Sequence, residues 1–153
     1  ESVDEKELDA LVQGIHGAGM VPLVIAPKGG PVAGEIVAQR TYLTAASIEL
    51  DAVVVASPAA PAADAAPSLD QKAGAADSEA VDPRVVKVLQ EMWRHSKAIL
   101  ALEPAEAVLA AAQVSGKGVE SAADGASAVS RLTELLPAHR VWERFPTTGR
   151  LAD

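Results

Sequence analysis

The sequence predicts an α/β protein in which a parallel β-sheet carries helices on both faces. Two short apolar runs, DAVVVAS at residues 51–57 and AILAL at residues 98–102, have the length and composition of buried parallel strands. Stretches with helical periodicity alternate with these runs, which is typical of a sheet covered on both sides. The 153 residues fit a single domain with one core.

The opening stretch SVDEKELDALVQGIHGAG predicts a helix whose apolar residues lie on one face. Ser2 and Glu5 have the spacing of a capping box, and acidic residues fill the first turn, where the helix dipole favours them. Gly17 and Gly19 are expected to supply the left-handed stop.

Residues 20–27, MVPLVIAP, predict a short buried strand, and Pro22 is expected to keep its first residues out of the hydrogen-bonded ladder. Residues 28–51 are rich in glycine and in alternating apolar positions, which indicates a small hairpin or an irregular excursion. The strand at 51–57 follows. Residues 57–81 are biased to Ala, Pro and Asp without apolar periodicity, and a mobile surface loop is expected there.

Three further elements follow the loop. Asp82 is a good N-cap for a helix that has Pro83 at its first position, and the AILAL strand comes next. A helix is then predicted from Pro104 to about Gln113, a short strand within VSGKGVESAADG, and a last helix capped by Asp124. Pro137 ends that helix, and residues 137–153 form an extended tail.

This order of elements favours a flavodoxin-like, doubly wound parallel sheet. Such folds usually open with a strand in the middle of the sheet, whereas this sequence begins with the helix that should follow it. The first strand is therefore expected to be missing because the fragment starts just after it. The alternative is that another part of a longer chain fills the gap.

Composition excludes several classes of function. The net charge of −8 argues against binding to nucleic acid or to an anionic membrane surface, both of which need clustered Lys and Arg. The absence of cysteine excludes disulfides, thiolate chemistry and cysteine-based zinc sites. No run reaches the roughly 18–20 apolar residues of a membrane span, and the acidic start is unlike a signal peptide, so a cytoplasmic domain is expected.

Glu103 stands at the strand-to-helix turn where many α/β enzymes place a nucleophile. A carboxylate there could act as a general acid or base, but a role in stabilising the helix N-terminus is favoured. His16, His95 and His139 lack the spacing of zinc ligands, and a helical-face pair with Glu91 accounts for His95. The glycines of APKGGPVAG match no phosphate-binding motif and indicate a turn. No catalytic, cofactor-binding or metal site is predicted.

The tail segment AHRVWERF concentrates aromatic and arginine side chains, in a chain whose aromatic content is 3%. Trp and Arg are favoured anchors of protein interfaces, so Arg140, Trp142, Arg144 and Phe145 are candidate interface residues. Packing of this segment on its own domain is an equally weighted alternative.

The stretch TELLPAHRVWERFP, supported in the same order by IAPKGG, TYLTAASIELDAVVV and EMWRHSKAI, carries a family resemblance. The chain resembles the C-terminal domain of large-subunit haem catalases, a domain related to the DJ-1/PfpI group within the class I glutamine amidotransferase-like fold. In that group the strand-to-helix turn carries a catalytic Cys followed by His. Here Glu103 and Pro104 occupy those two positions.

The resemblance implies a non-catalytic accessory domain that stabilises the subunit or oligomer of a catalase. Its partners would be the catalase core and neighbouring subunits, and the haem that decomposes hydrogen peroxide would belong to that core. The R-x-x-x-Y motif of the haem ligand is absent here, because the only tyrosine is Tyr42 and residue 38 is Ala. Two alternatives are a holdase-like chaperone that binds unfolded proteins and a DJ-1/PfpI-like hydrolase or glyoxalase that uses Glu103. The lack of cysteine argues against the latter.

Overall fold

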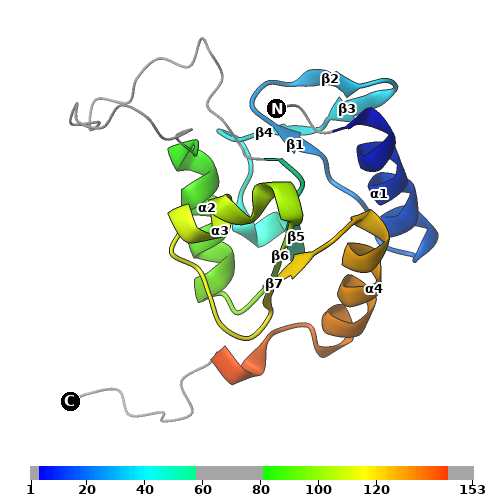
Figure 1. Cartoon of the computed structure of the whole chain (residues 1–153). Helices are drawn as coiled ribbons and strands as arrows, with labels where there is room; N and C mark the ends of the chain where they lie inside the picture. The colour runs from blue at the N-terminus through cyan, green and yellow to red at the C-terminus, as the bar shows by residue number, and fades with distance from the viewer. Residues whose placement is uncertain (1–3, 58–80, 145–153) are drawn as a thin grey trace, which may run out of the picture.

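A parallel three-stranded sheet lies at the centre of the molecule between two layers of helices (Figure 1). The computed structural model describes residues 4–57 and 81–144. The sheet has the order β5 (Ala52–Val55), β6 (Ala98–Leu102), β7 (Val119–Ala122). This architecture confirms the predicted α/β class, while the flavodoxin-like order stays a prediction. Most of the predicted loop and the last nine residues of the tail lie outside the described residues.

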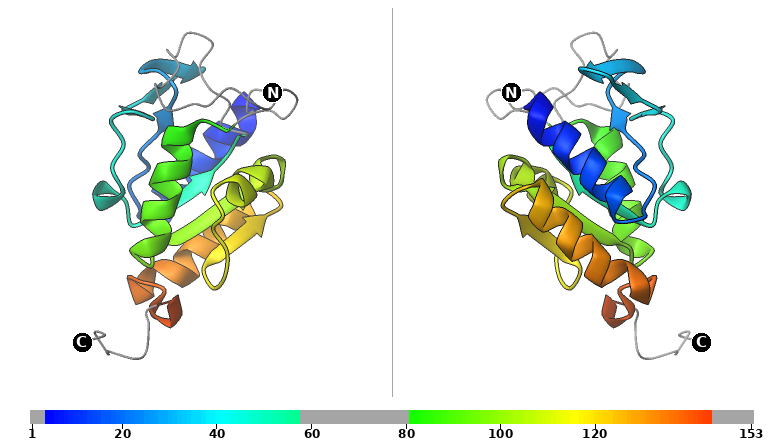
Figure 2. Two further views of the ribbon diagram at one scale, coloured as in Figure 1. Left: turned by 90° about the vertical axis from the view of Figure 1, so that its left-hand side faces the viewer. Right: turned by 90° about the vertical axis from the view of Figure 1, so that its right-hand side faces the viewer.

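The helices cover both faces of this sheet (Figure 2). The helix α1 (Glu5–Gly17) packs beside α4 (Gly125–Leu135) on one face. The helix α2 (Pro83–Arg94) and the short helix α3 (Glu106–Ala111) lie on the other face. Among the described residues, no helix combines the length and the apolar character needed to cross a bilayer.

The strand β6 is the middle of the core because all five of its residues are buried. Its side chains alternate between the two faces, as they must in a strand. Ile99 and Ala101 join one hydrophobic cluster with Leu89 and Met92 of α2. The opposite cluster contains the remaining β6 residues together with side chains from α1, β7 and α4: Leu11, Ala98, Leu100, Leu102, Ala122, Ala128 and Leu132.

The start of α1 differs from the predicted capping box. Asp4 is the N-cap, and its Oδ1 accepts a hydrogen bond from the Lys6 backbone N at 2.8 Å. Ser2, the predicted cap, lies outside the described residues. Asp is as good a cap as Ser, and its charge also interacts with the helix dipole, so the cap and the helix start lie two residues later than predicted. Gly17 is still helical, whereas Gly19 has the expected left-handed backbone with φ of +80°.

Four small strands follow α1. The predicted hairpin is confirmed as the antiparallel pair β2 (Gly30–Ala33) and β3 (Ile36–Ala38). The predicted strand at 20–27 is reduced to β1 (Ile25–Ala26), which pairs in parallel with β4 (Arg40–Thr41). One reason is that the Val24 backbone N donates to the Gln39 side chain at 2.7 Å, outside any ladder.

The caps of α2 and α4 are confirmed. Asp82 accepts hydrogen bonds from the Arg84 backbone N and Nε, both at 2.9 Å, and its side chain is buried. The Arg84 guanidinium holds the pKa of the Asp82 carboxyl below its ordinary value. Asp124 caps α4 by accepting from the Ser127 backbone N at 2.7 Å.

Three short 3₁₀ helices of three residues each lie in the second half of the chain. The helix predicted from Pro104 to Gln113 is divided into η2 (Glu103–Ala105) and α3. After α4 come η3 (Leu136–Ala138), which contains the predicted break at Pro137, and η4 (Trp142–Arg144). A further 3₁₀ turn, η1 (Ser47–Glu49), precedes β5.

Gln113→Gly is expected to stabilise the domain by about 0.5–1 kcal/mol, because Gln113 is exposed and closes α3 with φ of +55°. Only glycine adopts that backbone conformation without strain. The matched control is Ala111→Gly in the helical part of α3, which should cost about 0.5–1 kcal/mol. Urea unfolding measures both, and a loss of stability in both variants would contradict the prediction.

Candidate functional sites at the elbow and the tail

Glu103 follows β6 at the carboxyl end of the sheet, the edge at which α/β proteins usually bind ligands. Its side chain is exposed and opens η2. Neither η2 nor α3 receives a side-chain cap hydrogen bond at its N-terminus. Glu103 lies in the first turn of η2, where a carboxylate interacts favourably with the helix dipole, and the cap position falls on Leu102, which has no polar side chain. The expected role of Glu103 at the helix N-terminus therefore stays a prediction that rests on the dipole and not on a capping hydrogen bond.

The backbone at this turn also differs from that of a nucleophile elbow. An elbow holds its nucleophile in a sharp, strained turn. The non-glycine residues with positive φ in the described chain are Ser96, Gln113 and His139, and Glu103 is not among them. The strand-to-helix arrangement is thus preserved without the strained geometry that presents a nucleophile.

The histidines do not converge. His16 lies at the end of α1, and His139 follows η3. His95 caps the end of α2, and its Nδ1 lies 3.3 Å from Ser47 Oγ rather than pairing with Glu91 as predicted. Tertiary packing of η1 against α2 brings Ser47 there. Within residues 4–57 and 81–144, no group of three or more His, Cys, Asp or Glu side chains is arranged to hold a metal ion.

Sequence reasoning missed a buried lysine at the opposite, amino end of the sheet. Lys97 precedes β6 and is only 3% exposed. Its Nζ donates hydrogen bonds to the backbone O of Ser47, at 2.6 Å, and to the backbone O of Leu50. Burial lowers the pKa of Lys97, and the positive charge of Arg140 lowers it further. No pattern in the sequence marks this residue, since a lysine between a helix and a strand is usually solvated.

The tail packs on the turn around this lysine. Arg140 Nη1 donates to the His95 backbone O at 3.1 Å, and Arg144 Nη2 donates to the backbone O of Lys97. Between them the Val141 backbone N donates to the Ser96 backbone O at 2.6 Å, and the Val141 side chain is buried. The two arginines therefore contact their own domain through backbone carbonyls.

Two tail side chains, Trp142 and Arg144, have surface or hydrogen-bonding groups that a partner protein could contact. The Trp142 side chain is 56% exposed, although its Nε1 donates to the Ala138 backbone O at 3.0 Å. The Nε and Nη1 atoms of Arg144 are buried and have no hydrogen-bond partner among the described residues. Phe145, the fourth candidate, lies outside the described residues. Whether these residues form an interface stays a prediction.

Comparisons with protein families and with curated proteins were made for the whole chain. The family described as the C-terminal domain found in long catalases matches residues 1–146. A comparison with curated proteins found no matching sequence. The family match spans both the strand-to-helix turn at Glu103 and the packed tail, and it agrees with the resemblance that the tail sequence carries. The chain belongs to the family of C-terminal domains found in long catalases.

Proposed function

We propose that this chain is a non-catalytic accessory domain that stabilises the subunit or the oligomer of a long catalase. The observation that carries the proposal is the family match over residues 1–146. The geometry of the elbow supports it, because Glu103 is exposed and unstrained where related enzymes would need an activated nucleophile. A DJ-1/PfpI-like hydrolase or glyoxalase activity has no comparable support.

The family implies haem in the catalase part of such a protein, and the residues described here do not fit that group. The haem iron of catalase is held by a tyrosine, which must lose its proton to bind the metal. Burial raises the pKa of Tyr42, the only tyrosine, and so favours its protonated form. Peroxide decomposition therefore belongs, in this proposal, to the catalase core.

The tail is the proposed contact surface toward the catalase core or a neighbouring subunit. Trp142 supplies a large exposed aromatic side chain, and Arg144 supplies buried donors that an acceptor from outside the described residues would satisfy. Arg140 lies beside them and is already bound to its own domain. Trp and Arg side chains are enriched at the centres of protein interfaces, which supports this surface as the contact.

Removal of residues 1–153 from the parent catalase is expected to speed its thermal inactivation and to weaken its oligomer. The measurement compares the half-life of peroxide decomposition at elevated temperature and the mass of the assembly with and without the domain. Within the intact parent, Trp142→Ala should weaken the assembly more than Trp93→Ala. Trp93 is the matched control because it is also partly exposed, at 40%, but lies on α2. Identical stability and assembly after deletion would rule the proposal out.

A holdase role is the alternative. The observation that favours it is a set of large apolar side chains left exposed, of which Val21 at 91% and Ile48 at 84% are the most open. Failure to suppress aggregation of unfolded clients at several-fold molar excess would reject this alternative.

A further inference from the structure

The end of α2 and the tail together form a positively charged patch. This patch, the basic end, comprises residues 94–97 and 139–144, which lie side by side at one end of the molecule (Figure 2). It carries four positive charges and one negative charge, whereas the whole chain has a net charge of −8. We propose that the basic end binds an acidic segment of the catalase core, whose carboxylates pair with the arginines around Trp142. This inference rests on the proposed function and adds the chemistry of the partner.

The arginines of the basic end lack a carboxylate partner among residues 4–57 and 81–144. No ion pair there includes Arg94, Arg140 or Arg144. Every other arginine that the structure describes has such a partner. These ion pairs are Arg40–Glu49, Arg84–Asp82 and Arg131–Glu120. The uncompensated charge is therefore a feature of the basic end and not of the arginines in general.

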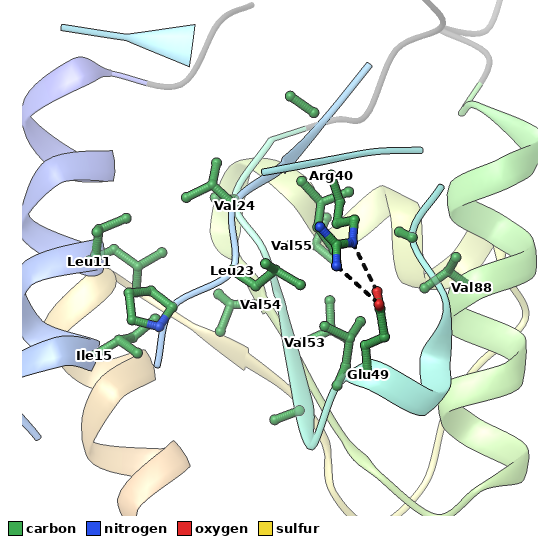
Figure 3. A pocket seen from close by; sticks show the side chains of 18 of the residues that line it. Leu11, Ile15, Leu23, Val24, Arg40, Glu49, Val53, Val54, Val55 and Val88 are labelled. Carbon is green, nitrogen blue, oxygen red and sulfur yellow. Dashed lines mark hydrogen bonds and ion pairs between the residues drawn. The ribbon is translucent and has the colours of Figure 1, made fainter. Parts of the chain in front are cut away.

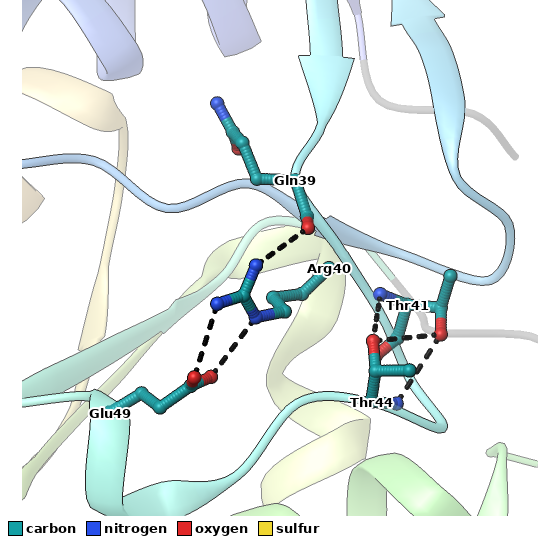
Figure 4. Close-up of polar contacts among 5 residues, drawn as sticks. All are labelled: Gln39, Arg40, Thr41, Thr44 and Glu49. Carbon is teal, nitrogen blue, oxygen red and sulfur yellow. Dashed lines mark hydrogen bonds and ion pairs between the residues drawn. The ribbon is translucent and has the colours of Figure 1, made fainter.

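Arg40 illustrates how a paired arginine is held in this domain. It lines a largely apolar cavity together with Leu11 and Val88 (Figure 3). Its Nε and Nη2 donate to the two carboxylate oxygens of Glu49 at 3.2 and 3.1 Å (Figure 4). Because Glu49 compensates the charge of Arg40, this pair offers an acidic ligand no free cation.

The cations of the basic end bind backbone carbonyls instead. Arg140 donates to the backbone O of His95, and Arg144 donates to the backbone O of Lys97. The Lys97 ammonium group donates to two further carbonyls. A carbonyl satisfies a donor but carries no net charge, so the positive charges remain and repel one another. In agreement with this, burial and then the charge of Arg140 lower the pKa of Lys97.

Neighbouring groups offset only part of this charge. Arg94 lies in the last turn of α2, where the helix dipole favours a cation, but the tail arginines come from another segment. Glu143, the one acidic side chain of the patch, has its Oε1 3.3 Å from Lys117 Nζ. Asp51 raises the pKa of Lys97, but by less than burial and the nearby arginine lower it. The basic end therefore keeps a net positive charge.

The side chains of the patch indicate a protein partner. Arg94 and His95 are exposed, and Trp142 is 56% exposed. A guanidinium group matches a carboxylate with two parallel hydrogen bonds, and Trp and Arg are favoured anchors of protein interfaces. The Nε and Nη1 atoms of Arg144 add two buried donors that lack a partner among the described residues. Such donors need an acceptor, which an acidic segment would supply.

A short acidic segment also fits the charge of the chain better than a nucleic acid or an anionic membrane. Those polyanions bring many negative charges at once, so the net charge of −8 repels them. A short segment brings few carboxylates and binds at close range, where the basic end determines the potential.

The first test measures binding of a short Glu/Leu peptide to the full chain, with Gln in place of Glu in the control peptide. Only the Glu peptide is expected to bind, and its Kd should rise about tenfold between about 0.05 and 0.5 M NaCl. Arg94→Glu should weaken binding about tenfold, whereas Lys87→Glu, the same charge change elsewhere on α2, should have less than about a twofold effect.

Three results of this test would overturn the proposal. One is that the Glu peptide does not bind or binds no better than the Gln peptide. Another is that phosphatidylserine vesicles or single-stranded DNA bind more tightly than the Glu peptide. The third is that binding appears only after removal of residues 145–153, since the occupant would then be the end of this chain itself.

The second test uses the intact parent catalase. Arg94→Glu with Arg140→Glu is expected to speed thermal inactivation at low salt, relative to Lys6→Glu with Lys87→Glu, which changes the net charge equally at exposed positions. The difference should vanish at about 0.5 M NaCl, because ions screen the lost attraction. A folding defect would persist at high salt, and Arg94→Glu alone leaves the carbonyl contacts of Arg140 and Arg144 intact.

The outcomes separate this inference from the proposed function. If removal of the domain destabilises the parent but the two double variants behave alike at low salt, the proposed function stands and the acidic partner is rejected. If removal of the domain leaves the parent unchanged, the proposed function itself fails, whatever the peptide shows.

Discussion

Lys97→Met is expected to lower the free energy of unfolding by about 2–4 kcal/mol, since two buried carbonyl groups would each lose a hydrogen bond worth about 1–3 kcal/mol. These carbonyls belong to Ser47, which opens η1, and to Leu50, which follows its end. The loss is partly offset because methionine has a similar length and does not bury a charge. Urea unfolding at neutral pH measures the difference.

The pH dependence of this effect has a defined sign. Burial lowers the pKa of Lys97 from its ordinary value of 10.5. The unfolded chain then holds this proton more tightly than the folded chain, so stability rises with pH between the folded pKa and 10.5. Lys97→Met should remove this rise in the alkaline range.

Lys87→Met is the matched control for Lys97→Met. Lys87 lies on α2 with an exposed side chain, and the substitution removes the same charge. A change within about 0.5 kcal/mol, with the alkaline rise preserved, is expected for this control. If the two variants lost equal stability, the carbonyl contacts of Lys97 would contribute nothing measurable.

Gly118→Ala is expected to destabilise the domain by about 2–4 kcal/mol, because left-handed strain and an overpacked contact add. Gly118 has φ of +73°, and a Cβ built there would lie 2.5 Å from Val141 Cγ2. Val141 belongs to the tail segment that packs on the turn before β6. The substitution therefore pushes the tail away from the domain, and thermal unfolding with the fluorescence of Trp142 reports both effects.

Two variants separate strain from the tail contact. Gly116→Ala has the same kind of backbone, with φ of +97°, but a Cβ there would meet nothing within 4 Å. It should cost about 1–2 kcal/mol from strain alone. The double variant Gly118→Ala with Val141→Ala should be less destabilised than the sum of its single variants. Additive losses would mean that Val141 does not pack against Gly118.

Much of the local structure was predictable because its signals lie within a few residues of one another. Asp82 and Asp124 were recognised as helix caps, and both accept the backbone hydrogen bonds that define a cap. The AILAL run was recognised as a buried strand, and all five residues are buried in β6. Where two residues compete for one local role, the prediction was less reliable, as the replacement of Ser2 by Asp4 at the start of α1 shows.

The candidate sites were less predictable. The strand-to-helix turn at Glu103 was located correctly, but the sequence could not show that the cap position falls on Leu102 and that no side chain caps this turn. Only two residues of the strand predicted at 20–27 take part in a ladder. The length of a strand depends on its neighbours, and among the described residues β1 pairs with β4 alone. Neither outcome depends on composition or periodicity, so neither could be seen in the sequence.

The sequence by itself determined the α/β class, the helix caps, the central strand and the resemblance to a catalase domain. Only the tertiary structure decided the partners of Lys97, which lie 47 and 50 residues away along the chain, and the docking of Arg140 on a carbonyl 45 residues away. It also decided that, among the described residues, no ladder joins β1 to β5. The physical reason is the distance along the sequence over which each interaction acts. Caps and periodicity act over about four residues, whereas a buried charge and an open strand edge are defined by what the folded chain brings beside them.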